Sequence, residues 1–308
     1  MFILVIYTGF TSDNFFTKNN FMNILMNMSS RLVIALGIAG CVITAGCDLS
    51  AGRMIGFGAC ISGMLLQRMD YSGKFFPDMQ PLNVFVVALI AMLVCAAFGT
   101  VTGFFIAYLN VPPFIATLAM MEIVYGIGLI VTNATPLGGY VEQYTNVSNG
   151  KFLGINYLIW IAIIVAAITW FIFNMTRHGK YMYAIGGNPQ AAEVAGVPVK
   201  ATLILIYMKA AAMYGLAGFM LGAKAGGASV QTGYGYEMEA IAACTIGGVS
   251  VTGGRGKVSS AIIGVAVFEL LKVALQYLGM NANAQYIAIG VVIFIAISLD
   301  IRKYIARK

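Results

Sequence analysis

Residues 82–108 read LNVFVVALIAMLVCAAFGTVTGFFIAY, a stretch in which no side chain is charged. A transmembrane helix needs about 20 predominantly apolar residues, so this stretch is long enough to cross a bilayer. Similar apolar segments lie on both sides of it and are separated by short polar loops. They are residues 32–47, 54–68, 112–132, 156–173, 202–225, 237–252, 258–279 and 284–300. The pattern predicts an all-α, polytopic transmembrane helical bundle with about nine or ten helices.

The composition of the whole chain points to the same class of protein. Of the 308 residues, 60% are hydrophobic and 9% are charged, whereas ordinary soluble domains are about 45–50% apolar and about 25% charged. This composition excludes a soluble enzyme, a disordered tail and a nucleic-acid-binding module. Because the loops are short, we expect residues 1–308 to form a single transmembrane domain within the lipid bilayer, with no nucleic acid as a partner.

One more apolar run, Met1 to Phe10, is too short to span a membrane. It lacks the charged start and the cleavage site of a signal peptide. We therefore expect residues 1–10 to be the end of a truncated first helix whose beginning is missing from this chain.

The cysteines and the single histidine give no sign of a metal or cofactor site. The five cysteines lie in or beside apolar stretches without a CxxC or Cys/His pair, so we expect buried, unreactive thiols. His178 lies in a basic loop with no second ligand nearby and is expected to be a solvated loop residue. We expect neither a bound metal nor a cofactor.

The formal net charge of +7 carries information about orientation, because lysine and arginine are enriched in the cytoplasmic loops of membrane proteins. If the loop 174–201 is cytoplasmic, alternation along the spans assigns every charged loop residue to one side. The inside set is Arg53, Arg177, Lys180, Lys200, Arg255, Lys257, Arg302, Lys303, Arg307 and Lys308. The outside set is Lys18, Arg31, Arg68, Lys74 and Lys151, together with Asp13, Asp70, Asp78, Glu142 and Glu237. The larger basic set on the inside predicts a cytoplasmic C-terminus.

Two glycine-rich segments interrupt the apolar pattern and predict broken or re-entrant helices. The first is GCDLSAGR at residues 46–53, and the second is IGGVSVTGGRG at residues 246–256. Each glycine costs a helix about 1 kcal/mol relative to alanine, and irregular backbone at membrane depth needs protein or water to satisfy its polar groups. We expect both segments to border a translocation path; a pair of cytoplasmic turns is the equally open alternative. The candidate path residues here are Asp48, Ser50, Gly52, Gly247, Gly248 and Ser250.

Ionisable residues inside the predicted spans are costly and therefore informative. They are Glu122, Glu239, Glu269, Lys209 and Lys272. Glu269 and Lys272 stand three residues apart on one helix, which favours a direct pair over a proton relay. Glu122 and Glu239 are further candidates for the translocation path, and Glu122 could pair with Lys209 between helices.

The strongest local signal lies in the loop 184–198, AIGGNPQAAEVAGVP. Pro189 fits the first turn of a helix with Asn188 as its N-cap, and Gly196 can end that helix about two turns later. Signals at both ends predict a short helix outside the membrane, a type of element that docks into a groove on a partner. The expected docking residues are Gly187, Asn188, Pro189, Gln190, Ala191, Ala192, Glu193 and Gly196.

Several motifs carry a family resemblance. Residues 190–196, QAAEVAG, resemble the E-A-A-x-x-x-G loop of ATP-binding-cassette importer permeases, with Gln190 in place of the usual glutamate. DLSAG at 48–52, AIGGNP at 184–189, and YEMEAIAAC at 236–244 followed by GGVS at 247–250 are similar to ribose/galactose-type sugar permeases. The galactose/methyl-galactoside type is the most similar, although Lys209 occupies a position that is usually small or polar.

The resemblance implies a function and a set of partners. In this family a cytoplasmic ATPase subunit with two nucleotide-binding domains binds the coupling helices, so the permease is a transporter subunit and not an enzyme. The family also implies a second permease copy in a homodimer and a periplasmic or other extracytoplasmic sugar-binding protein. The implied cargo is a monosaccharide such as galactose, a methyl galactoside or glucose, and the implied location is the bacterial inner membrane.

Two other classes of function remain open at this point. A self-sufficient secondary carrier for a small polar solute would use Glu122, Glu239 or Glu269 to couple transport to protons. A structural or assembly membrane protein would have no transport activity. The coupling-loop pattern favours the importer permease, because a secondary carrier has no need of that loop.

Overall fold

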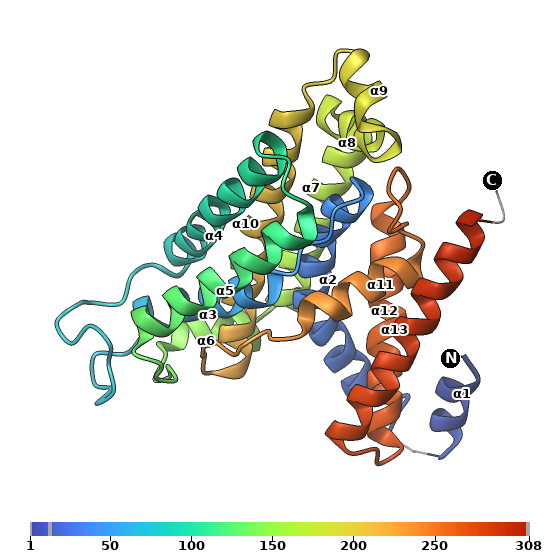
Figure 1. Cartoon of the computed structure of the whole chain (residues 1–308). Coiled ribbons are helices and arrows are strands. Elements are labelled where there is room, and N and C mark those ends of the chain that lie inside the picture. The colour runs from blue at the N-terminus through green and yellow to red at the C-terminus, as the bar shows by residue number, and fades with distance from the viewer. Residues whose placement is uncertain (1, 12–13, 306–308) are drawn as a thin grey trace.

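The computed structural model describes residues 2–11 and 14–305 and is built almost entirely of helices (Figure 1). Within these residues, six helices are long and apolar enough to cross a membrane. They are α2 (Lys18–Ile43), α4 (Val84–Tyr108), α5 (Pro113–Thr132), α7 (Tyr157–Met175), α10 (Val199–Ala225) and α12 (Val258–Tyr277).

The remaining elements are shorter or lie at the ends of the chain. Half-length helices α3 (Ala51–Leu65) and α11 (Tyr236–Gly247) follow α2 and α10, while α1 (Phe2–Thr11) and α13 (Ala282–Ile305) lie near the two termini. Short helices α6 (Glu142–Asn149), α8 (Arg177–Gly187) and α9 (Pro189–Val194) lie between spans. Strands β1 (Lys151–Phe152) and β2 (Ile155–Asn156) pair antiparallel, with Lys151 opposite Asn156.

Each predicted apolar segment coincides with a helix, which confirms the predicted helical bundle. Two boundaries differ. α2 begins at Lys18 and not near residue 32, because asparagine, serine and lysine lower the hydropathy of its first half, while Thr17 caps its N-terminus. α11 ends at Gly247 and not near residue 252, because Gly248 adopts a left-handed conformation (φ 102°) that ends a helix.

Some expectations fall on residues outside this description. The run Met1–Phe10 coincides with α1 apart from Met1, which lies outside the described residues, as does Asp13. In the basic tail, Arg307 and Lys308 are also outside them, and the side chains of Arg302 and Lys303 are not described.

α10 forms the centre of the bundle, with α2, α3 and α4 packed around it. Small residues permit close approach: a Cβ added at Gly215 would overlap the Ala91 carbonyl of α4, and one added at Gly218 would overlap the Ile55 carbonyl of α3. Because no hydrophobic effect drives helices together in lipid, such contacts supply much of the packing. These intrahelical glycines therefore serve helix packing.

α3 and α11 are half-length helices whose first turns meet inside the bundle. At 1.5 Å per residue they are about 22 Å and about 18 Å long, less than the roughly 30 Å of a bilayer core. Gly52 of α3 lies against the side chain of Glu237 of α11. From this meeting point α3 runs toward the end of the molecule that holds α6, and α11 runs toward the end that holds α8 (Figure 1). α2 and α10 also run in opposite directions, so the unit of a long helix and a half-helix occurs twice, inverted.

Candidate functional site

The α3 junction, residues 44–53, holds three of the predicted path residues, Asp48, Ser50 and Gly52, in the protein interior. Asp48 and Ser50 are both buried. The Ser50 backbone N–H and hydroxyl donate to Asp48 Oδ1 at 3.0 Å and 2.6 Å, and the Tyr214 hydroxyl donates to Asp48 Oδ2 at 3.2 Å. Because both carboxylate oxygens have partners within the chain, the α3 junction is a closed, buried turn and not a surface loop.

Arg53, in the first turn of α3, lies between two aromatic rings. Its guanidinium carbon is 4.0 Å from the ring centroid of Tyr125 and 4.6 Å from that of Tyr234. Arg53 Nη1 donates to Gln231 Oε1 at 2.6 Å, and Gln231 Nε2 donates to the Tyr125 hydroxyl at 2.8 Å. Cation–π contacts hold a guanidinium in place without an ion pair. The expectation that Arg53 is a loop charge is therefore wrong, since it joins α3 to α5 and to the segment before α11.

Gly52 and Glu237 form the contact between the two half-helices. A Cβ added at Gly52 would overlap Glu237 Oε2 and approach the Gly233 carbonyl oxygen at 2.9 Å. Glu237 is 5% exposed, and its Oε2 has no hydrogen-bond partner in the part of the chain that the structure describes. Glu237 was expected in an outside loop; it lies instead in the first turn of α11, where the helix dipole favours a negative charge.

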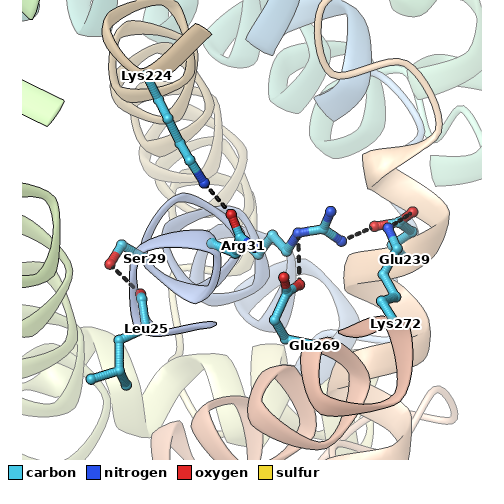
Figure 2. Close-up of polar contacts among 8 residues, drawn as sticks. Leu25, Ser29, Arg31, Lys224, Glu239, Glu269 and Lys272 are labelled. Atoms are coloured by element: carbon cyan, nitrogen blue, oxygen red, sulfur yellow. Dashed lines mark hydrogen bonds and ion pairs between the residues drawn. The ribbon is translucent and has the colours of Figure 1, made fainter. Parts of the chain in front are cut away.

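The α11 junction, residues 233–239, borders a cluster of four charged side chains that joins α2, α11 and α12 (Figure 2). Arg31 Nη1 pairs with Glu239, and Arg31 Nε pairs with Glu269 Oε2 at 3.0 Å. Lys272 Nζ pairs with Glu239 Oε1 at 2.7 Å, while the Tyr236 ring covers the Arg31 guanidinium at 4.9 Å. Two cations balance two carboxylates, as charges at membrane depth require.

Two sequence-based expectations fail at this charge cluster. Arg31 is not an outside loop residue but lies near the midpoint of α2. Glu269 and Lys272 do not pair with each other; they bind Arg31 and Glu239 on other helices. The sequence pointed to Glu239 but missed Arg31, because the two partners are 208 residues apart and no local spacing links them.

A cavity of about 520 Å³ opens beside the charge cluster, between α11, α12 and α13. Its polar lining includes Tyr234, Tyr236, Glu239, Lys272, Gln276 and Tyr286. Among these, sequence reasoning singled out only Glu239 and Lys272. The signal that could have found the tyrosines is the stretch YGYEME at residues 234–239, which repeats aromatic and acidic residues at short intervals. Aromatic, amide and charged groups around one cavity suit a small polar ligand.

The predicted path residues of the second segment lie apart from this cavity. Gly247 packs against the Ser260 carbonyl of α12, where a Cβ would overlap it, and Gly248 ends α11. Ser250 lies in a turn that closes through a hydrogen bond from Ser250 N to the Arg255 carbonyl at 3.0 Å. Residues 248–256 thus form a turn at the end of α11, and residues 46–53 form a turn buried within the bundle. The role of both segments in a translocation path stays a prediction.

The turn 248–256 connects the ends of α2 and α8 in a contact that we call the α8 joint (Ile43, Tyr183, Gly186, Gly254 and Gly256). Gly254 N donates to the Ile43 carbonyl at 2.8 Å, and the Tyr183 hydroxyl donates to the Gly256 carbonyl at 2.8 Å. A Cβ added at Gly186 would overlap the Ile43 carbonyl. Because the backbones touch directly, a displacement of α8 would press on α2 and on the turn that follows α11.

α9 extends beyond the α8 joint as a short helix at one end of the molecule (Figure 1). Asn188 Oδ1 accepts a hydrogen bond from Ala191 N at 3.0 Å, Pro189 occupies the first turn, and Gly196 has a φ of 82°. The predicted helix and its caps are confirmed. Of the predicted docking residues, Ala192 is buried. The exposed ones are Gly187, Asn188, Pro189, Gln190, Ala191, Glu193 and Gly196.

Glu122, Lys209 and His178 complete the set of candidates. Glu122 is exposed on α5 and Lys209 is half-buried on α10, and neither forms an ion pair among the described residues. His178 is not a solvated loop residue, because it is partly buried on α8 and lines a small cavity with Lys209. Burial and the charge of Lys209 lower the pKa of His178 to about 4, so the imidazole is neutral at pH 7.

Apolar helices of spanning length, inverted half-helices and a polar cavity beside a broken helix are typical of multi-pass membrane transport proteins. Residues 20–297 match the family described as "Branched-chain amino acid transport system / permease component", and the chain belongs to this family.

Curated relatives resemble the chain along its whole length. The galactose/methyl galactoside import permease protein MglC of Escherichia coli (strain K12) is 40% identical over 100% of this chain and 94% of its own length. MglC of Haemophilus influenzae is 41% identical with the same coverage. The ribose import permease protein RbsC of Escherichia coli (strain K12) is 32% identical over 98% of this chain and 92% of its own length. No solved structure matches the chain. The family description mentions amino acids, whereas these relatives are named for sugars.

Proposed function

We propose that this chain is the membrane-spanning permease subunit of an ATP-binding-cassette importer that carries a monosaccharide, of the galactose or methyl galactoside type, into the cytoplasm. The observation that carries the proposal is the 40% identity with a galactose/methyl galactoside import permease along the entire chain. The identity with a ribose import permease is lower, 32%. The polar cavity at the α11 junction supports a small polar cargo.

Coupling to ATP is assigned to α9. This helix is exposed at one end of the bundle, where an ATPase subunit with two nucleotide-binding domains can bind it. Movement of α9 passes through α8 to the α8 joint and from there to α2 and α11. ATP can shift the permease between outward and inward access only if the ATP-bound ATPase subunit binds the two states with different affinity. The α8 joint is the contact through which this preference acts on the bundle.

Orientation follows from the distribution of charge. The basic residues Arg177, Lys180, Lys200, Arg255 and Lys257 lie on or beside α8, α9 and the α8 joint. The enrichment of basic residues in cytoplasmic loops makes this end cytoplasmic and, by parity, the C-terminus as well. The opposite end then receives cargo from an extracytoplasmic sugar-binding protein, and a second permease copy completes a homodimer in a bacterial inner membrane.

Among the described residues, the three carboxylates expected to couple a secondary carrier to protons are either paired or exposed. Glu239 and Glu269 are paired with Arg31 and Lys272, and Glu122 is exposed on the outer face of the chain. Glu237 lies inside but is packed against Gly52. We therefore favour the importer.

The experiment reconstitutes the permease with its ATPase and binding protein in proteoliposomes and measures ATP-dependent uptake of galactose. Ala191→Trp, on the exposed face of α9, should abolish uptake while the protein remains in the membrane. Ala97→Trp is the matched control, because Ala97 is likewise an exposed alanine but lies on α4 and not on α9. Normal uptake by Ala191→Trp would contradict the coupling role, and a wild-type complex that imports no monosaccharide would contradict the proposed function.

A further inference from the structure

We propose that the cavity between α11, α12 and α13 is a monosaccharide-binding subsite within the permease itself, at the α11 junction. The inference rests on the proposed function and adds to it a specific place where the permease holds its cargo.

The charge around the cavity excludes lipid as its occupant. Arg31, Glu239 and Lys272 line the cavity and keep side-chain exposures of 19%, 13% and 13%. Charged groups facing acyl chains are costly, so such groups face protein or water. The lining holds two cations, Arg31 and Lys272, and two carboxylates, Glu237 and Glu239. A cavity with balanced charge attracts neither anions nor cations by its net charge. It therefore favours a neutral polar solute.

A second cavity in the same chain has a mainly apolar lining and serves as a comparison. It lies between α2 and α7, has a volume of about 710 Å³, and is lined mainly by side chains such as Phe21, Leu25 and Ile159. The α11 cavity is smaller, about 520 Å³, and carries tyrosines, amides and charges. The α2–α7 cavity has only Lys18 and Ser29 as polar lining residues, whereas most of the α11 cavity's named lining groups can exchange hydrogen bonds with hydroxyls.

The lining matches the two kinds of surface on a sugar ring. Tyr234 and Tyr286, which are 64% and 72% exposed, offer aromatic faces to the C–H groups of a ring. The amides of Gln276 and Gln285 can both donate to and accept from hydroxyls. Glu237 also borders the cavity and has an unpartnered Oε2. The volume falls within the usual range for small-ligand pockets, about 300–1,000 Å³.

The position of the cavity suits a translocation path. Arg31 lies near the midpoint of α2, so the charge cluster is about half-way across the bundle. α11 begins at the cavity as a half-helix, and transporters place substrate sites near the bilayer midplane, beside broken helices. Tyr286 and Gln285 come from α13, so a movement of α13 relative to α11 would change the shape of the subsite.

The test uses single cysteines in the complete importer, reconstituted without ATP or binding protein so that the permease's own affinity is measured. Native thiols give little background, because Cys41, Cys60, Cys95 and Cys244 are buried and the partly buried Cys47 can be replaced by serine. Tyr286→Cys and Gln276→Cys place a thiol in the cavity. Phe294→Cys is the control. Phe294 lies on the same helix as Tyr286 and is similarly exposed, 75% for Phe294 and 72% for Tyr286, but it does not line the cavity.

Galactose should slow the reaction of both cavity thiols with a water-soluble maleimide. At a sugar concentration of about twice Kd the rate should fall about threefold, whereas the Phe294→Cys rate should not change. An impermeant polyol that is not transported should protect neither position. Tyr286→Ala should also raise the KM for uptake by about threefold to tenfold through the loss of one aromatic face.

The outcomes separate this inference from the proposed function. If the wild-type importer carries galactose but the sugar protects neither Tyr286→Cys nor Gln276→Cys, the subsite is refuted and the proposed function stands. Equal protection of Phe294→Cys would also refute it, because a general conformational change would then explain the effect. If the complex carries no monosaccharide at all, both proposals fail.

Discussion

The α3 junction and the α11 junction occupy corresponding places in the two inverted units, yet they are built in opposite ways. At the α3 junction, Asp48 is buried and both of its carboxylate oxygens are bonded within the chain. At the α11 junction, Glu239 shares a four-charge cluster and faces a cavity of about 520 Å³. The comparison supports our proposal that the α11 half-helix meets the cargo, while the α3 half-helix, whose polar groups are bonded within the chain, is a fixed support.

The largest predicted effect concerns the charge cluster of the α11 junction. Arg31→Gln leaves Glu239 paired with Lys272 but removes the ion-pair partner that Glu269 has among the described residues. Breaking a buried pair by removing one partner costs about 3–5 kcal/mol, because the remaining charge is uncompensated. We expect the free energy of unfolding, measured by SDS titration in mixed micelles, to fall by about this amount.

A double variant provides the control for Arg31. Arg31→Gln combined with Glu269→Gln restores the balance of charge, since Glu239 keeps Lys272. It should recover most of the lost stability. If both variants are equally unstable, the shape of the arginine and not its charge holds α2 to α12, and the α11 junction would resemble the packed α3 junction.

A slightly smaller effect is expected at the α3 junction. Asp48→Ala removes the acceptor for the Ser50 N–H, the Ser50 hydroxyl and the Tyr214 hydroxyl. Unsatisfied buried donors cost about 1–3 kcal/mol each before relaxation, so we expect a loss of about 2–4 kcal/mol in the same titration. Asp48→Asn keeps an acceptor oxygen and should lose about 1 kcal/mol.

The KM for sugar separates the two junctions. Asp48 does not line the α11 cavity, so Asp48→Asn should leave the KM for uptake unchanged although it lowers stability. A clear rise in KM would indicate that Asp48 borders the translocation path, as the sequence predicted. The proposed difference between a supporting α3 junction and a cargo-binding α11 junction would then be wrong.

The sequence predicted the frame of the molecule because hydropathy and capping are local properties. Nine apolar segments fall on helices, and Asn188, Pro189 and Gly196 define α9 as expected. The breaks at residues 46–53 and near Gly247 were also visible, since glycine and polar residues stop a helix wherever they occur.

The chemistry of the α11 junction was not predictable in the same way. Arg31 contacts Glu239 over a separation of 208 residues, and the choice of Lys272 for Glu239 instead of Glu269 depends on how helices pack. Local spacing favoured the wrong pair because an i, i+3 contact on one helix competes with contacts between helices. The cavity also combines Arg31 of α2 with three elements from the chain's last third, which no local pattern relates.

The contact between the two half-helices gives a third prediction. Gly52→Ala would place a Cβ where Glu237 Oε2 now lies, close to the Gly233 carbonyl. Overpacking of this kind costs about 1–3 kcal/mol, and we expect the lower part of that range because a glutamate side chain can move. Thermal unfolding in detergent measures the loss.

The cycle with Glu237 shows whether this contact is specific. Glu237→Ala should relieve the clash, so Gly52→Ala should cost less in the Glu237→Ala background than in the wild type. Additive effects of the two substitutions would mean that the clash is with the Gly233 backbone, and that α3 and α11 are not coupled through Glu237.

The smallest predicted effect lies at the link between α5 and the segment before α11. Tyr125→Phe keeps the ring under the Arg53 guanidinium and removes only the hydroxyl that accepts from Gln231 at 2.8 Å. Because Gln231 is exposed, water can replace this bond and the loss should be about 0.5 kcal/mol. Tyr125→Leu also removes the cation–π contact and should cost about 0.5–1 kcal/mol more. Equal losses for Tyr125→Phe and Tyr125→Leu would show that the hydrogen bond, and not the aromatic face, fixes Arg53.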